Sequence, residues 1–371
     1  MRQAVTVGAL MFLGTNPAER RPNERALRGA WEDYARSFVQ ADGRVIDPSS
    51  EGASTSEGQA YAMVRAVWAN DEKRFDSVRT WTRNNLQRGD PARLPAWKWG
   101  KRADGSWGIL DENPASDADQ LIAWSLLIAA ERWLRPELAD EARGLLARIW
   151  QEEVAEVLGG RWLLPGPWAA AGRTVVLNPS YFMPFAWRDF AVADPERDWQ
   201  SLIDPAYTML ASLMAAGRLP PDWVYFSAED GVREAPPPER ADADHYGYEA
   251  MRIPWNLAAD VIFHDESRAR HLLVNFADLG RGWRRSGLIP ARMRVDGEPM
   301  EAYEHPALYG ALLPAWGLVR PEDAPALYAN ELMPLRSAHG YGGAREYYGQ
   351  NWVWLGIALW SGQAFTPHGG R

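Results

Sequence analysis

The sequence predicts an all-α fold in which six inner helices are surrounded by six outer helices. Helical periodicity dominates the 371 residues, and strand-like alternation is scarce. Long connections rich in Gly, Pro, Asp and Trp alternate with very short ones, and a short connection forces its two helices to be antiparallel neighbours. The helices that follow the long connections are also the more apolar and aromatic set, as expected of an inner layer. An irregular helical bundle is the alternative.

Twelve helical segments are predicted. In order they are 23–40, 57–69, 72–87, 117–134, 137–156, 179–191, 197–216, 248–263, 267–281, 303–318, 321–333 and 344–361. The segments that follow long connections begin at 57, 117, 179, 248, 303 and 344. Because inner helices would all begin at the same end, the long connections should gather there. Loops on a rigid scaffold are where functional sites are usually built.

The first predicted inner helix, 57–69, opens with a candidate catalytic acid. Ser54 and Glu57 have the spacing of a capping box, in which Glu57 would bond to the backbone at the helix start. That structural role would hold Glu57 ionised. A role as a proton donor therefore requires a neighbouring charge that raises the pKa of Glu57.

The long connection before residue 117 contains Asn85, Trp97 and Trp99, followed by Trp107 and Asp111. Trp is over-represented in the whole chain, with 20 residues against 13 Tyr and 10 Phe. Trp is awkward to bury completely, and exposed indole rings can stack on the C–H faces of sugars. The alternative is that each of these Trp side chains only plugs the loop onto the helices.

The segment 117–134 is apolar on every face, which predicts a central helix. Ser116 is a plausible N-cap, so Asp117 and Asp119 would lie in the first turn, where the helix dipole favours negative charge. The two carboxylates are either catalytic or simple helix caps.

The openings of two further inner helices repeat this arrangement. Tyr181 follows Asn178-Pro179-Ser180, and Glu249 lies in the stretch His245 to Arg252. Together with the acids at positions 57 and 117, four candidate residues thus recur in the first turn of an inner helix. Several acids around one rim are less easily explained as caps than any one of them.

Composition excludes several classes of function. The net charge of -9 and the lack of a basic stripe argue against nucleic-acid binding. The absence of cysteine excludes thiol chemistry and disulfides. There is no G-x-S-x-G elbow, phosphate-binding loop, H-E-x-x-H motif or EF-hand, and the six His show no ligand spacing, so neither a metal nor a cofactor is expected.

The chain is expected to form one domain, from about residue 23 to residue 371. Residues 1–22 resemble a short signal peptide or an N-terminal extension, because an apolar run from Ala4 to Leu13 follows Arg2. No clear cleavage site follows that run. No apolar run reaches the length of roughly 18 residues that a membrane span needs.

Several motifs resemble glycoside hydrolase family 8, and most of all its periplasmic enzymes that accompany bacterial cellulose synthase. The run from Ala115 to Ala129 resembles the signature of that family, and Ser56 to Tyr61 resembles its general-acid segment. The other matching segments, all in the same order, are Gly43–Asp47, Leu94–Trp97, Trp99–Gly100, Asn178–Tyr181 and Pro221–Val224. The similarity runs from about residue 27 to about residue 360.

The resemblance implies an (α/α)6 barrel and hydrolysis of β-1,4-linked glycans with inversion. It implies that Glu57 is the proton donor and that Asp117 lies beneath the sugar at the cleavage point. The Asp117 position has also been described as a nucleophile, which an inverting enzyme does not need. Tyr181 would help to hold the water. The substrate-binding residues would be Tyr61, Asn85, Trp97, Trp99, Asp119 and Arg252.

The chain departs from the family at its general base. Related cellulases have Asp in a Tyr-Asp-Ala-x-Arg segment, whereas this chain has Glu249 between Tyr248 and Ala250. Glu249 is therefore expected to be the base, and the alternative is that it only pairs with Arg252 on the same helix.

The resemblance implies a β-1,4-glucan substrate, a bacterial cellulose synthase complex as partner, and a periplasmic or secreted location. Two other functions stay open. One is hydrolysis of chitosan, xylan or mixed-linkage glucan by the same fold. The other is a glucan-binding protein whose catalysis is weakened by the change at position 249.

Overall fold

The structure, a computed structural model, describes residues 22–157, 160–171, 174–227, 231–233 and 245–367. The predicted signal-peptide run therefore lies outside the described residues. The α-helices are α1 (Glu24–Phe38), α2 (Ser56–Trp68), α3 (Glu72–Asn85), α4 (Ser116–Arg132), α5 (Pro136–Glu153), α6 (Pro184–Ala193), α7 (Ile203–Leu213), α8 (Ile253–His264), α9 (Ser267–Leu273), α10 (Ala277–Ser286), α11 (Pro306–Val319), α12 (Ala324–Leu327) and α13 (Tyr347–Trp360).

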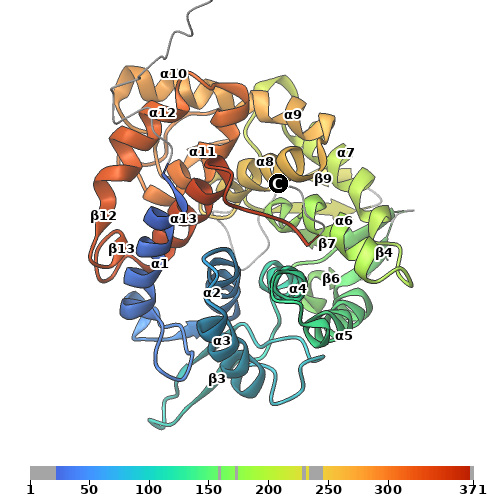
Figure 1. Ribbon diagram of the computed structural model, residues 1–371. Coiled ribbons are helices and arrows are strands. Elements are labelled where there is room, and N and C mark those ends of the chain that lie inside the picture. Colours follow the sequence, from blue (N-terminus) through green and yellow to red (C-terminus); the bar gives the residue numbers. More distant parts are fainter. Residues whose placement is uncertain (1–21, 158–159, 172–173, 228–230, 234–244, 368–371) are drawn as a thin grey trace, which may run out of the picture.

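Six helices contact one another in a closed sequence around the centre of the molecule (Figure 1). Helix α2 packs on α4, α4 on α6, α6 on α8, α8 on α11, and α11 on α13. Helix α13 returns to α2, because Arg65 Nη1 donates to Asn351 Oδ1 at 2.8 Å and Trp68 stacks on Trp354 with ring centroids 6.3 Å apart. These six helices correspond to the six predicted inner segments.

The central helices are more deeply buried than the outer helices, as the sequence predicts. Every residue of α4 from Ser116 to Ala129 is buried, whereas α3 and α5 bury only one face. A helix that is apolar on every side is stable only when other elements surround it. In the part of the chain that the structure describes, no helix combines the length and apolar character needed to cross a membrane.

Two predicted inner helices open with a 3₁₀ turn before the α-helix begins. The predicted segment 179–191 is a 3₁₀ turn, η4 (Pro179–Tyr181), followed by α6 from Pro184. Met183 has ψ of 67°, because a residue before proline avoids the helical region. The segment 248–263 likewise opens with a 3₁₀ turn, η7 (Ala250–Arg252), before α8. Three outer segments are also broken: 197–216 into α7 with a 3₁₀ turn on each side, 267–281 into α9 and α10, and 321–333 into α12 and a π-helix at Tyr328–Leu332.

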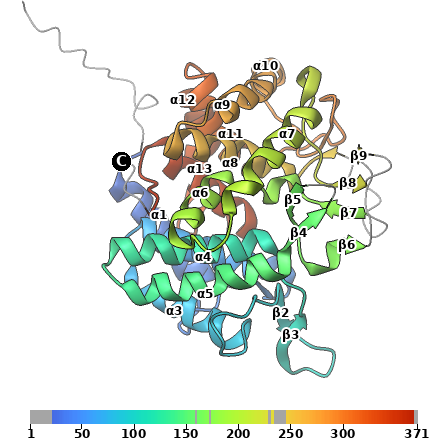
Figure 2. The same ribbon diagram turned by 90° about the vertical axis from the view of Figure 1, so that its right-hand side faces the viewer.

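Short antiparallel strands occupy the connections that the sequence predicts only as loops. One sheet joins β1 (Ser54–Thr55), β2 (Lys98–Lys101) and β3 (Trp107–Asp111), and another joins β6 (Ala170–Ala171), β7 (Thr174–Leu177), β8 (Val224–Ser227) and β9 (Gly231–Arg233). Three two-stranded sheets pair β4 (Val154–Val157) with β5 (Gly160–Leu163), β10 (His245–Tyr246) with β11 (Met293–Arg294), and β12 (Arg336–Ser337) with β13 (Gly340–Tyr341). Figure 2 shows β2 to β9 on one side of the molecule. Strands this short carry too little alternation to be recognised from the sequence.

A buried pair of carboxyl groups lies behind the start of α4. Asp119 on α4 and Glu153 at the end of α5 are both fully buried, and burial raises the pKa of each carboxyl well above its ordinary value. The two side chains are hydrogen-bonded to each other, and no N–H or hydroxyl donor among the described residues reaches their oxygens. Because two ionised carboxylates have no hydrogen between them, at least one of the pair is protonated.

This pair predicts a loss of stability at high pH. Both pKa values are higher in the folded than in the unfolded chain, so the pair contributes stability that is complete below about pH 4 and is lost as pH rises through the folded-state values. Asp119→Asn and Glu153→Gln should remove part of this loss. Above about pH 4, the free energy of unfolding should fall less steeply in each variant than in the parent, by at most about 1.4 kcal/mol per pH unit for each proton.

Urea unfolding between pH 4 and pH 9 measures this difference. Glu196→Gln is the matched control, because the Glu196 side chain is 84% exposed. Parallel pH curves for the parent and both buried variants would show that the pair is ionised in the folded protein.

Candidate active site

A cavity of about 350 Å³ opens where α2, α4, η4 and η7 begin or end. It contains all four residues that the sequence predicts at the rim, namely Glu57, Asp117, Tyr181 and Glu249. Its other lining residues are Ser56, Trp97, Asp111, Asn113, Pro114, Ala115, Pro165, Trp168, Trp223 and Arg252. The expectation that these acids lie close together is confirmed.

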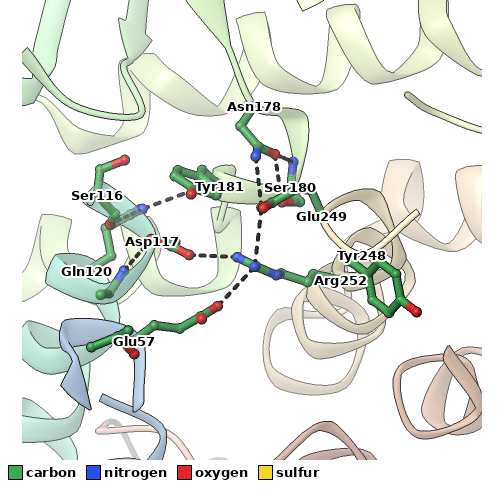
Figure 3. A network of polar contacts seen from close by, with 12 residues as sticks. Glu57, Ser116, Asp117, Gln120, Asn178, Ser180, Tyr181, Tyr248, Glu249 and Arg252 are labelled. Atoms are coloured by element: carbon green, nitrogen blue, oxygen red, sulfur yellow. Dashed lines mark hydrogen bonds and ion pairs between the residues drawn. The ribbon is translucent and has the colours of Figure 1, made fainter. Parts of the chain in front are cut away.

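The guanidinium group of Arg252 joins the three acids (Figure 3). Its Nη1 lies 2.6 Å from Asp117 Oδ2, and its Nη2 lies 2.9 Å from Glu57 Oε1 and 3.2 Å from Glu249 Oε2. The Arg252 side chain is buried, and its charge partly neutralises the three carboxyl groups. The sequence predicted Arg252 as a substrate-binding residue, and the structure places it against all three acids.

Glu57 lies in the first turn of α2 but does not cap that helix. Thr55 is the N-cap, and its hydroxyl accepts a hydrogen bond from the Gly58 amide. The predicted capping box with Ser54 is therefore wrong. Glu57 Oε1 instead accepts a hydrogen bond of 2.6 Å from the Tyr61 hydroxyl, one helical turn further on. Its side chain is 22% exposed, so it can meet a ligand in the cavity.

Asp117 is the most buried of the three acids. Burial is the main reason that its pKa rises to about 7, and the charges of Glu57 and Glu249 raise it further, while Arg252 lowers it. Ala115 is the N-cap residue of α4 and no side chain caps this helix, so the predicted cap by Ser116 is wrong. Asp117 Oδ1 accepts from the Ala118 amide at 2.8 Å. The helix start therefore orients Asp117 toward the cavity.

Glu249 lies just before η7, with its carboxylate held from two sides. Asn178 Nδ2 donates to Glu249 Oε2 at 3.0 Å, and Arg252 contacts the same oxygen. The pairing with Arg252 that the sequence offered as an alternative is present. It does not withdraw Glu249 from the cavity, which Glu249 lines with 20% of its side chain exposed.

Tyr181 lies at the end of η4, on the opposite side of Arg252 from α2 (Figure 3). Its backbone carbonyl accepts from Gln120 Nε2 at 3.1 Å, which fixes the turn to α4. Burial raises the pKa of its hydroxyl well above the ordinary value, so this group is protonated at neutral pH.

Three Trp side chains line the cavity, of which the sequence predicts only Trp97 as a site residue. Trp168 follows β5, and Trp223 lies 6.1 Å from the Tyr181 ring. Trp223 belongs to a segment, Pro221–Val224, that was matched only as a motif. Both additional Trp residues lie in connections at the cavity end of the molecule. That position is the one sequence signal from which they could have been predicted as site residues.

Four predicted substrate-binding residues do not line this cavity. Tyr61 is buried and contacts Glu57 instead. Asp119 is fully buried against Glu153, so in this conformation it cannot touch a substrate. Asn85 ends α3 and donates to the Trp81 carbonyl, and Trp99 lies between the rings of Trp81 and Trp107.

The site provides acid–base chemistry. Carboxyl groups of different exposure, with one pKa raised to about 7, can donate and accept protons near neutral pH. Among the described residues, no group of three His, Asp or Glu side chains is arranged to hold a metal ion.

Similar proteins found by sequence and by structure are named as glucanases. An endoglucanase of Pseudomonas fluorescens is 40% identical over 228 residues, which are 60% of this chain and 56% of that protein. An endoglucanase of Salmonella typhi is 33% identical over 270 residues, or 72% of this chain and 71% of that protein. The crystal structure of an endo-1,4-D-glucanase from Vibrio fischeri matches with a TM-score of 0.76 and 28% identity, over 89% of this chain and 94% of the other.

This chain spans just over half the length of the first of these relatives. The family model described as glycosyl hydrolases family 8 matches residues 1–356, nearly the whole sequence. Of the acids that line the cavity, Glu57 and Asp117 come from segments whose motifs resemble that family, whereas Glu249 stands where the chain departs from it. The chain belongs to glycosyl hydrolases family 8.

Proposed function

We propose that this protein is an endo-β-1,4-glucanase that cleaves its substrate with inversion at the anomeric carbon. The observation that carries the proposal is the grouping of Glu57, Asp117 and Glu249 around Arg252 in a cavity lined by Trp side chains. Aromatic rings bind the apolar faces of sugars, and paired carboxyl groups cleave glycosidic bonds. Relatives named endoglucanase support the choice of β-1,4-glucan.

The reaction transfers two protons. Glu57 gives its proton to the glycosidic oxygen as the C–O bond breaks, and Glu249 takes a proton from the water that bonds to the anomeric carbon. Asp117 lies between them, where its carboxylate form balances the positive charge that develops on the sugar, and Arg252 holds the three acids in place through its contacts with each. Tyr181 lines the cavity, and its protonated hydroxyl can orient the water by a hydrogen bond.

Arg252 holds one oxygen of the acid and one oxygen of the base close together, so a movement of Glu249 or Arg252 as substrate enters would widen their separation. Glu57 Oε1 and Glu249 Oε2 lie 2.9 and 3.2 Å from the same Arg252 nitrogen, so these two oxygens are at most 6.1 Å apart. Inverting glycosidases separate the two groups by about 6.5–9.5 Å to admit a water. The extra methylene of Glu, relative to the Asp of related enzymes, gives Glu249 the reach to contact Arg252 and the freedom to fold aside.

We further propose an (α/α)6 barrel, supported by the closed sequence of contacts among α2, α4, α6, α8, α11 and α13. A periplasmic or secreted location and service to a cellulose synthase complex are supported by the resemblance of the motifs. Chitosan, xylan and mixed-linkage glucan are the competing substrates. Glucan binding without turnover is the competing function, favoured by the change at position 249.

The parent protein is expected to release reducing sugar from carboxymethylcellulose faster than from chitosan, xylan or mixed-linkage glucan. NMR of the first products should show the α-anomer.

Glu57→Gln keeps the side-chain shape and its acceptor oxygen but removes the proton, so activity should fall by about 10²–10⁴-fold. The exposed substitution Glu196→Gln is the control. Binding without cleavage by the parent would favour the binding function, and more than about a tenth of parent activity in Glu57→Gln would rule out that residue as the acid.

Glu249→Ala is expected to abolish turnover while binding of the polymer persists, because the substitution removes the base but none of the Trp side chains. Azide should restore part of the cleavage, since a small anion can take the vacated place. Glu249→Asp should keep or raise activity, because the shorter side chain widens the separation from Glu57. Initial rates and affinity gels measure the two properties separately. Parent-like cleavage by Glu249→Ala would mean that another group is the base.

Trp97 and Trp99 should respond differently to substitution by Ala. Trp97 is half-buried and lines the cavity, so its loss should weaken polymer binding with little change in the free energy of unfolding. Trp99 packs on Trp107 and Trp81, with ring centroids 5.3 Å away in each case. Its loss should cost about 1–3 kcal/mol of stability. Equal losses of binding and unchanged stability in both variants would instead make Trp99 a second sugar platform.

A further inference from the structure

Asp222 is a buried carboxylate outside the cavity that holds the turn carrying Glu249. Its Oδ1 accepts hydrogen bonds from the backbone amides of Gly247 at 2.9 Å and Ala250 at 2.8 Å. Its own backbone amide donates to the His245 carbonyl at 2.7 Å. Asp222 therefore ties both ends of the stretch 247–250 to the chain that precedes β8.

Glu249 lies between the two anchored amides. Its side chain forms no cap for η7, so the backbone of the turn decides where its carboxylate starts. The same turn leads into Arg252, whose amide donates to the Glu249 carbonyl at 3.1 Å. A shift of this turn would move the proposed base and the arginine that contacts all three acids.

The second oxygen of Asp222 faces a polar group rather than solvent. His245 Nε2 lies 3.4 Å from Asp222 Oδ2 and accepts a hydrogen bond of 3.1 Å from Arg292 Nε, and Arg292 in turn lies 3.5 Å from Glu301. Burial, together with the charge of Glu249, raises the pKa of Asp222 to about 7, while the amide hydrogen bonds lower it.

The turn fits closely against Asp222. A Cβ atom placed on Gly247 would lie 2.9 Å from Asp222 Oδ2 and 2.8 Å from His245 Nε2, closer than such atoms normally approach. Trp223, the next residue after Asp222, lines the cavity from the same segment. One short segment thus contributes a wall of the cavity and the support of its proposed base.

We propose that Asp222 is a positioning residue, which places the Glu249 carboxylate at the water by fixing the backbone of the turn from Gly247 to Ala250. The inference rests on the proposed function, in which Glu249 is the base. A displacement of about 1 Å at a reacting group can cost on the order of 100-fold in rate. The loss should therefore appear in kcat, because the Trp side chains that bind the polymer are not altered.

Asp222→Ala removes the acceptor, and Asp222→Asn keeps it in nearly the same place. For Asp222→Ala we expect kcat on carboxymethylcellulose to fall by about 10–100-fold with KM changed less than about twofold. Asp222→Asn should stay within about threefold of the parent, because its amide oxygen still accepts both backbone hydrogen bonds. Parent-like kcat in Asp222→Ala, or an equal loss in both variants, would overturn the proposal.

Gly247→Ala provides a second route to the same displacement without changing any charge. It should also lower kcat, whereas Gly282→Ala, where a Cβ meets nothing within 4 Å, is the matched control. If Asp222→Ala does not fold, as judged by circular dichroism, Gly247→Ala decides the question: an unchanged kcat in that variant would overturn the proposal.

The double variant Asp222→Ala/Glu249→Ala separates positioning from a general structural effect. If Asp222 acts through Glu249, adding its substitution to Glu249→Ala should not lower the azide-restored rate of that variant further. A further loss as large as that of Asp222→Ala alone would overturn the proposal. Full activity in Glu249→Ala would reject the proposed base and this inference with it. An inactive Glu249→Ala beside an active Asp222→Ala would reject only the inference.

Discussion

The contact of one buried guanidinium with three carboxyl groups is the interaction on which the site depends. Glu57, Asp117 and Glu249 come from segments far apart in the sequence, and Arg252 lies within 3.2 Å of an oxygen of each. Without that cation, three carboxylates in a half-enclosed cavity would repel one another, and their removal from water would cost free energy that no attraction offsets. The arginine therefore allows the acids to lie close together.

The same contacts give each acid a different environment. Asp117 is the most enclosed, and burial brings its pKa to about 7. Glu57 is more exposed and is held by the Tyr61 hydroxyl, while Glu249 is held by the Asn178 amide. Carboxyl groups whose surroundings differ can hold protons differently at one pH, which is the property that acid–base cleavage of a glycosidic bond needs.

The scaffold contributes through the ends of its elements. Glu57 and Asp117 lie in the first turns of α2 and α4, where the positive ends of the helix dipoles favour carboxylates. Tyr181 and Arg252 lie on 3₁₀ turns that precede α6 and α8, and Glu249 immediately precedes the second of these turns. Because the central helices are surrounded by others, these ends have little freedom to move. The proposed support of Glu249 by Asp222 extends this principle to a turn that no helix fixes.

The sequence by itself determined the helices and the rim. Apolar residues on every face of 117–134 required a surrounded helix, and the alternating connection lengths placed the acids at one end. Local patterns were less reliable for individual side chains. The Ser54–Glu57 spacing predicted a capping box, but Thr55 caps α2, and Glu57 instead contacts Tyr61 on the next turn of the same helix and the distant Arg252. Only the tertiary structure decided that Arg252 joins three acids, that Asp119 faces Glu153, and that Asp222 supports the turn of Glu249. Apart from the pairing of Arg252 with Glu249, these contacts link residues from 25 to 195 positions apart, and no local periodicity encodes which distant side chains will meet.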